Sequence, residues 1–181
     1  LKILILPEEL LQNTEMCLKY LHPQEEEHRM KLSEILTPGL IFTNIKASEK
    51  SSCLNEIVKN ICNFETQLNP DLTLRLILNR EKLCSTALDN NIAIPHAKIP
   101  GLTRSHCGLA VNKKGIDFDS VDGELTKIII VLLHPEADSK NHLLILKNIA
   151  TLFSDKKIVN EIIQSNESYD IYRLIQSYEK K

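Results

Sequence analysis

Residues 126–134 read TKIIIVLLH and contain the longest uninterrupted apolar run of the chain, Ile128 to Leu133. This run is far too short to span a bilayer, which takes about 20 apolar residues in a helix. A short apolar run rich in β-branched residues is typical of a strand buried on both faces. We therefore predict that 126–134 is the central strand of a sheet and that Pro135 ends it.

Further strands and helices are predicted around this stretch. Short β-prone runs predict strands, and apolar residues spaced three and four apart predict helices. The predicted strands are 40–45, 85–88, 91–94, 106–111 and 116–118. The predicted helices run from 48 to about 64, from an Asn69-Pro70 cap to about 82, from a cap at 139 to about 153, from a cap at 154 or 155, and from 167. This pattern predicts an α/β fold, with a mixed central sheet of about five strands flanked by helices.

Apolar spacing also predicts which helix faces are buried. In the helix from 48, the residues expected to share one face are Leu54, Ile57, Val58 and Ile61. The helix over 69–82 has apolar residues around much of its circumference and is expected to be well buried. In the helix from 139, the expected buried face consists of Leu143, Leu146, Ala150 and Phe153. The segment 113–115, Lys-Lys-Gly, is expected to be a turn.

The bulk composition favours one domain that does not bind nucleic acid. A chain of 181 residues predicts a single domain, placed at 30–181, after an N-terminal extension of unknown role at 1–29. The net charge of −2 provides no basic excess for nucleic acid. Residues 1–29 do not resemble a secretory signal, because glutamates at 8, 9 and 15 interrupt them. With five scattered cysteines and no CxxC pair, we expect a cytoplasmic protein with reduced thiols and no membrane insertion.

Residues 80–97, REKLCSTALDNNIAIPHA, hold side chains suited to phosphoryl chemistry. Pro95 restricts the backbone beside His96, so the imidazole is expected to project from the end of a strand with limited freedom. Neutral imidazole is a good nucleophile near neutral pH. Arg80 offers a planar fork for phosphate oxygens, and the hydroxyls of Ser85 and Thr86 lie within plausible reach.

His142 is a second candidate, because it is expected near the start of the helix that follows the longest strand. Free backbone N–H groups and the positive end of the helix dipole favour an anion there. Ordinary roles compete for these residues: Arg80 as a cation at a helix C-terminus, and His142 as a locally hydrogen-bonded residue. For His106 and His134, at strand edges, a structural role is favoured. Glu81 is expected to be solvated.

The sequence lacks the motifs of several other kinds of active site. Zinc ligand patterns such as HExxH, HxH and CxxC are absent, and so are the phosphate-binding patterns GxxxxGK[ST] and GxGxxG. The nucleophile elbow GxSxG is absent as well.

From about 30 to 178 the chain resembles the enzyme IIA components of the phosphoenolpyruvate-dependent sugar phosphotransferase system, in the mannitol/fructose class. Within that class it looks most like the nitrogen-regulatory branch. The motifs that carry the resemblance are ILNREK at 77–82, ST at 85–86, IAIPHAK at 92–98, FDSVD at 118–122, LHP at 133–135 and HL at 142–143. The resemblance implies a mixed five-stranded sheet with helices on both sides, and no metal or organic cofactor.

The resemblance also implies roles for single residues. His96 would accept a phosphoryl group, through its Nε2 atom, from an HPr-type phosphocarrier protein. Arg80 and His142 would flank the phosphohistidine, and Ser85, with Thr86 beside it, is a weaker candidate for a supporting hydroxyl. The chain departs from the family in three places. Ala97 stands where many members have glycine, and Asp-Asn-Asn stands at 89–91 where the regulatory branch often has Gly-Asn-Gly. The segment 1–29 has no counterpart in the family.

Three functions are compatible with these residues. The first is a regulatory IIA phosphocarrier whose phosphorylation state changes which target proteins it binds. The second is a transport IIA that passes phosphate from His96 to a cysteine of a IIB domain for sugar uptake. The third is an interaction module that is no longer phosphorylated, which the presence of both His96 and His142 argues against.

Overall fold

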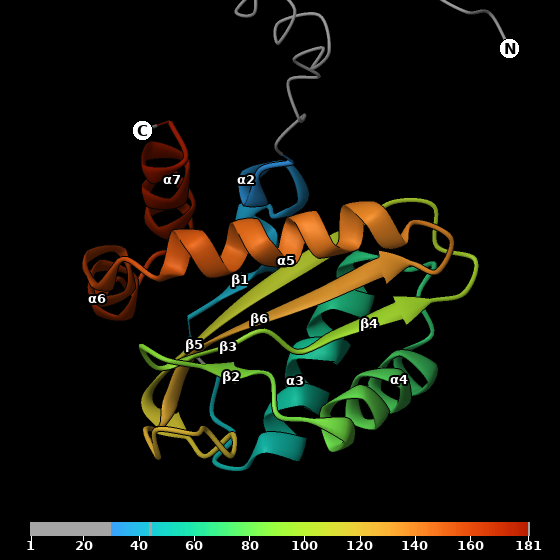
Figure 1. Cartoon of the computed structure of the whole chain (residues 1–181), viewed down its shortest axis with the longest axis horizontal. Helices are drawn as coiled ribbons and strands as arrows, with labels where there is room; N and C mark the ends of the chain where they lie inside the picture. Colours follow the sequence, from blue (N-terminus) through green and yellow to red (C-terminus); the bar gives the residue numbers. More distant parts are fainter. Residues whose placement is uncertain (1–29, 44, 181) are drawn as a thin grey trace, which may run out of the picture.

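The computed structural model describes residues 30–43 and 45–180, and the predicted extension at 1–29 lies outside them. The strands are β1 (Ile41–Phe42), β2 (Ala87–Leu88), β3 (Ile92–Ala93), β4 (His96–Ile99), β5 (His106–Ile116) and β6 (Thr126–Pro135). The helices are α2 (Leu32–Ile35), the 3-10 helix η2 (Pro38–Leu40), α3 (Lys50–Phe64), α4 (Pro70–Leu83), α5 (Ser139–Phe153), α6 (Lys156–Gln164) and α7 (Ser168–Tyr178). Figure 1 shows α3 and α4 on one side of the sheet and α5 on the other, which confirms the α/β prediction.

The sheet is mixed and six-stranded, and β6 lies at its centre as predicted. The strand order is β1-β5-β6-β3-β2, with β4 also paired to β6. β5 runs antiparallel to β6, whereas β3 and β4 run parallel to it. All side chains from Ile128 to Leu133 are completely buried. An apolar run covered on both faces by helices accounts for this position.

β3 and β4 form one interrupted line along the same edge of β6. Ala93 pairs with Ile129 and His96 pairs with Leu132, so the register is unchanged across the break. Pro95 lies in the break, since it has no N–H for a ladder bond, but its carbonyl still accepts from the N–H of Leu132 at 3.0 Å. The predicted count of about five strands is therefore six, with two of them collinear. His96 begins a strand rather than ending one.

Two helices are buried differently from the prediction. In α4 only Thr73, Ile77 and Glu81 are buried, because this helix covers the edge of the sheet near β4 and keeps one face in solvent. In α5 the buried residues are Ile145, Ile149 and Phe153, and Leu143 is 70% exposed. The predicted face of α3 is confirmed, since Leu54, Ile57, Val58 and Ile61 are all buried.

The predicted turn at 113–115 is wrong, because β5 continues through it with an irregularity between Val111 and Ile116. Gly115 makes this possible: it has φ +79°, and a Cβ there would lie 2.6 Å from the Cβ of Leu125. The turn before β3 is confirmed and uses Asn90 and Asn91 at positive φ, 68° and 64°. Asparagine tolerates this conformation better than most residues.

Helix caps hold the elements near the site in place. The Asn69 side chain accepts from the N–H of Leu72 and Pro70 is the first residue of α4, as predicted. α5 is capped by Asp138, one residue before the predicted cap, and α6 by Asp155. Among the described residues, none of the helices combines the length and apolar character needed to cross a membrane.

Candidate functional site

His96 lies at the start of β4 with its ring held by two hydrogen bonds. Nδ1 is 2.8 Å from the carbonyl oxygen of Ile94, and Nε2 is 3.1 Å from Nε of Arg80. A carbonyl only accepts, so Nδ1 must carry the hydrogen. In the neutral ring, Nε2 therefore has a lone pair and accepts from Arg80. The Ile94 carbonyl belongs to the break between β3 and β4, which also contains Pro95.

Arg80 reaches His96 from the last turn of α4. Its Nε donates to His96, while its Nη1 donates to the carbonyl oxygen of Cys84 at 3.0 Å. α4 packs against β4, which is why a residue sixteen positions earlier in the chain meets the imidazole. The guanidinium is thus fixed on two sides and presents positive charge directly beside Nε2 of His96.

His142 comes to the same place from α5, on the other side of the sheet edge. Its ring centroid lies 5.2 Å from that of His96. Nδ1 of His142 is buried and has no hydrogen-bond partner within the described residues. The predicted trio of His96, Arg80 and His142 is therefore assembled in the fold, from β4, α4 and α5.

The surroundings keep both histidines neutral at pH 7. Burial is the largest cause that lowers the pKa of His142, followed by the neighbouring rings of His96 and His134, and the pKa falls to about 4. Burial also lowers the pKa of His96, and the charge of Arg80 acts in the same direction. The hydrogen bond to the Ile94 carbonyl opposes this shift in part. A neutral His96 is the nucleophilic form.

His134 completes a row of three rings. It lies on β6, its side chain is 0% exposed, and its ring centroid is 5.0 Å from that of His142. Nδ1 is 2.7 Å from the hydroxyl of Ser105, and Nε2 contacts the carbonyl oxygen of Asp138. Burial with both nitrogens hydrogen-bonded agrees with the structural role favoured from the sequence. Its contact with His142 was not foreseen, since it depends on how α5 folds back onto β6.

The hydroxyls of Ser85 and Thr86, which were expected to support phosphate, donate hydrogen bonds to other groups. Ser85 Oγ donates to the Phe118 carbonyl at 2.5 Å, and Thr86 Oγ1 donates to the Glu81 carboxylate at 2.6 Å. Thr86 is also buried. The structure thus places neither hydroxyl in a hydrogen bond with His96, and either would have to turn to reach a phosphate there.

Glu81 corrects the sequence prediction, because it is only 6% exposed rather than solvated. Its carboxylate accepts from the N–H and hydroxyl of Thr86 and pairs with Lys50 Nζ at 2.9 Å. A buried carboxylate requires such partners. In the sequence, only its position on the same helical face as Ile77 and Thr73 signals burial.

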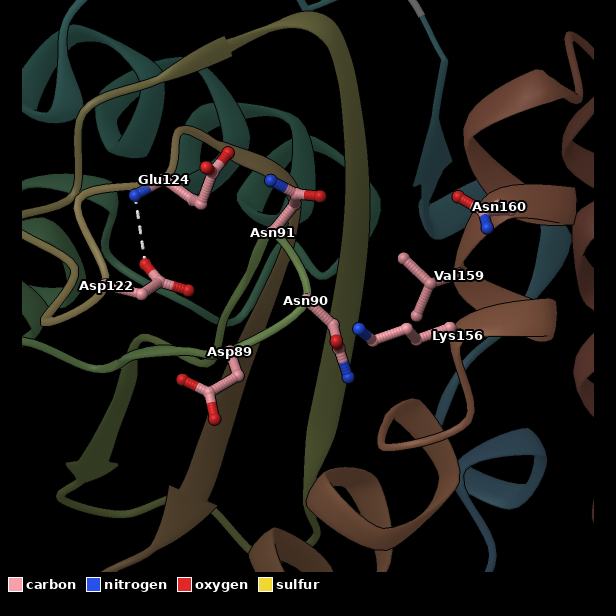
Figure 2. Close-up of a pocket in the computed structure, with 8 residues that line it drawn as sticks. All are labelled: Asp89, Asn90, Asn91, Asp122, Glu124, Lys156, Val159 and Asn160. Carbon is pink, nitrogen blue, oxygen red and sulfur yellow. Dashed lines mark hydrogen bonds between the residues drawn. The ribbon is translucent and has the colours of Figure 1, made fainter.

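A polar hollow of about 660 Å³ lies at the other end of β3 from His96. Figure 2 shows loop residues facing α6 across it, and the lining consists of Asp89, Asn90, Asn91, Asp122, Glu124, Lys156, Val159 and Asn160. Asn91 accepts from N–H groups at the start of β6, whereas His96 pairs with Leu132 further along that strand. Over residues 30–43 and 45–180, no three His, Cys, Asp or Glu side chains form a group that could hold a metal ion.

Comparison with known proteins gives one consistent family. The family described as "Phosphoenolpyruvate-dependent sugar phosphotransferase system, EIIA 2" matches residues 34–178. A nitrogen regulatory protein of Bradyrhizobium diazoefficiens is 31% identical over 146 residues, which are 81% of this chain and 95% of that protein. The fructose-specific EIIABC component of Bacillus subtilis is 29% identical over 152 residues, which are 83% of this chain and 24% of that protein.

A solved structure has the same fold over nearly its whole length. The nitrogen regulatory protein IIA-Ntr of Neisseria meningitidis superposes with a TM-score of 0.75 at 26% identity. The match covers 80% of this chain and 98% of that protein.

Proposed function

This chain belongs to the EIIA 2 family of the phosphoenolpyruvate-dependent sugar phosphotransferase system, and we propose that it is a phosphocarrier that accepts a phosphoryl group on Nε2 of His96. One observation carries the proposal. The Ile94 carbonyl holds the hydrogen on Nδ1, so the lone pair of Nε2 is directed toward the Arg80 guanidinium, where a phosphoryl group would find its counter-charge.

The transfer is a displacement between two imidazoles. The Nε2 lone pair of His96 attacks the phosphorus of a phosphohistidine on an HPr-type carrier, and the N–P bond of the donor breaks as the new one forms. The electron pair of the broken bond stays on the donor imidazole. Nε2 has no proton to lose, and Nδ1 keeps its hydrogen bond to the Ile94 carbonyl throughout. Such a reaction depends mainly on positioning and on stabilising charge on the phosphoryl oxygens.

Arg80 and His142 are the proposed stabilising groups. Arg80 shifts its Nε–H from Nε2 of His96 to a phosphoryl oxygen once Nε2 is bonded to phosphorus. The neutral His142 ring offers one N–H from the opposite side. Ser85 is a weaker support, because its hydroxyl must first leave the Phe118 carbonyl, and Thr86 must likewise leave Glu81.

The role proposed for the phosphorylated protein is regulatory: its phosphorylation state selects the target proteins that it binds. The match to a nitrogen regulatory protein over 95% of that protein's length favours this role. The alternative is transfer onward to a IIB cysteine for uptake of a fructose- or mannitol-type sugar, which the match to the fructose-specific component supports. The chemistry at His96 is the same in both.

Phosphorylation is tested with ³²P-labelled HPr-type carrier and the full chain. We expect acid-labile label on the wild type and none on His96→Ala, while His28→Ala, which removes another histidine, is labelled like the wild type. ¹⁵N NMR of the labelled imidazole should place the phosphoryl group on Nε2. A wild type that takes up no label from any HPr-type carrier would contradict the proposal and favour an interaction module without phosphorylation.

The regulatory and transport roles are separated by a second incubation. The phosphorylated chain is mixed with purified IIB domains of the fructose and mannitol types. Retention of label on His96 is the expected result. Rapid appearance of phosphocysteine on a IIB domain, coupled to sugar phosphorylation, would establish the transport role instead.

A further inference from the structure

We propose that His134 is a positioning residue that holds His142 in place beside His96. This inference rests on the proposed function, because it extends the set of side chains that serve transfer at His96. It starts from contacts that the transfer itself does not use. The His134 side chain is completely buried on β6, and it hydrogen-bonds through both ring nitrogens.

The partners of His134 determine which of its nitrogens carries the hydrogen. Nε2 contacts the carbonyl oxygen of Asp138, which can only accept, so Nε2 is the donor. In the tautomer with hydrogen on Nε2, Nδ1 accepts, and the Ser105 hydroxyl at 2.7 Å is its donor. The ring is held at both edges, by the loop before β5 and by the N-cap residue of α5.

Asp138 links this ring to His142 through the backbone. It is the N-cap of α5, and its carbonyl also accepts from the N–H of His142 at 3.3 Å. Its carboxylate accepts from the N–H of Asn141 at 3.3 Å. The hydrogen bond from His134 therefore ties the first turn of α5, which carries His142, to the end of β6.

The rings of His134, His142 and His96 also pack one after another in a row. His134 lies 5.0 Å from His142, which lies 5.2 Å from His96, measured between centroids. On the strands, His134 pairs with Lys98 and Leu132 pairs with His96, so both outer histidines are attached to the same strand pair. His142 alone comes from a helix, and its Nδ1 has no hydrogen-bond partner within the described residues. The His134 ring is therefore one of the two rings against which His142 is packed.

A purely structural role and a positioning role for His134 predict different effects of its substitution on transfer. If only its volume mattered, any substitution that preserves stability would preserve transfer. If the donor to the Asp138 carbonyl matters, a side chain that replaces Nε2–H should rescue transfer and one that cannot reach this carbonyl should not. Glutamine places its amide nitrogen near the Nε2 position, whereas asparagine reaches only as far as Nδ1.

The matched variants are therefore His134→Gln and His134→Asn, two neutral amides that differ by one methylene. Single-turnover transfer from phosphorylated HPr-type carrier is measured over a range of carrier concentrations. We expect His134→Asn to lower the limiting rate about tenfold or more with an unchanged half-saturating carrier concentration, as loss of alignment predicts. His134→Gln should stay within about threefold of the wild type.

Imidazole NMR tests the same inference without any phosphate. In the wild type, ¹⁵N shifts should show hydrogen on Nε2 of His134 and a cross-relaxation signal between the His134 and His142 rings. The His142 signals should be preserved in His134→Gln and displaced in His134→Asn. Because this measurement needs only the folded chain, it decides the inference even if the wild type takes up no phosphate, a result that would contradict only the proposed function.

Three results would overturn the inference. One is a wild-type His134 with its hydrogen on Nδ1, which is observable whether or not either variant folds. Another is a folded His134→Asn that transfers phosphate at the wild-type rate. The third is equal slowing in both amide variants, which would show that transfer does not depend on a donor to the Asp138 carbonyl.

Discussion

A single backbone carbonyl determines which ring nitrogen of His96 is free to react. Ile94 holds the hydrogen on Nδ1 at 2.8 Å, and Arg80 faces the other nitrogen. Burial keeps the ring neutral, and the charge of Arg80 adds to the lowering of its pKa. A group that would be an ordinary titrating histidine on the surface therefore presents one defined lone pair at neutral pH.

Replacing Arg80 should slow transfer more than it weakens carrier binding. We expect Arg80→Ala to lower the limiting rate of phosphorylation of His96 roughly 100-fold, because a cation that meets developing charge is removed. Arg80→Lys should recover part of the loss, since it restores the charge without the planar fork. Rapid-quench measurements over a range of labelled carrier concentrations give the limiting rate and the half-saturating carrier concentration of each variant. Unchanged kinetics in Arg80→Ala would refute its assigned role.

The low pKa of His142 makes stability depend on pH. Its pKa falls from the ordinary 6.5 to about 4 on folding, so between these values the unfolded chain binds a proton that the folded chain does not. The free energy of unfolding should therefore be highest above pH 6.5 and fall as the pH is lowered toward 4. Urea unfolding near pH 7 and near pH 5 measures this drop. In His142→Gln the drop should be smaller, and an equal drop would count against the shifted pKa.

Glu81 joins the segments that surround the site. It belongs to α4, pairs with Lys50 at the start of α3 and accepts two hydrogen bonds from Thr86. Lys50 also donates to the Phe118 carbonyl, which accepts from Ser85 as well. These contacts fix the chain just after Cys84, whose carbonyl holds Arg80. A buried carboxylate thus orders the segment on which the guanidinium depends.

Truncation of Glu81 should be costly because it leaves buried donors without an acceptor. We expect Glu81→Ala to reduce the free energy of unfolding by about 2–4 kcal/mol. Glu81→Gln retains an acceptor for Thr86 and should lose less. Glu124→Ala, at an exposed position, should change stability by less than about 0.5 kcal/mol. Urea titrations of the three variants are the measurement, and equal losses at positions 81 and 124 would contradict the buried network.

The core is built around β6, and helices from distant parts of the chain cover it. α3 and α4 come from the first half of the described chain, and α5 follows β6 directly. His96, Arg80 and His142 lie on three of the elements that pack together in this way. Their meeting therefore depends on the integrity of the entire core, and a core defect should affect both stability and transfer.

A cavity in β6 should destabilise this core. Ile130 is completely buried, so we expect Ile130→Ala to cost about 2–5 kcal/mol and Ile130→Val about 0.5–1.5 kcal/mol. Val121→Ala, at a fully exposed position, should be close to neutral. Thermal and urea unfolding of the three proteins provide the values. An alanine variant as stable as the valine variant would show that the core collapses around the lost volume.

Much of the fold could be predicted because its signals are local. The apolar run at 128–133, the face of α3 and the Asn69-Pro70 cap each depend on neighbouring residues, and all three are confirmed. The errors share another cause. The continuation of β5 through Gly115 and the burial of Glu81 depend on partners far along the chain, which spacing does not reveal.

The site shows the same contrast between features that local sequence predicts and features that depend on distant partners. Residue chemistry alone identified an imidazole after a proline, an arginine and a helix-start histidine as a set suited to phosphate, because these properties belong to single residues and their neighbours. Only the tertiary structure decided that Arg80 faces Nε2, that His142 stands 5.2 Å from His96, and that His134 adjoins it. The physical reason is that these distances follow from the register of β4 on β6 and the packing of α4 and α5, which long-range contacts alone determine.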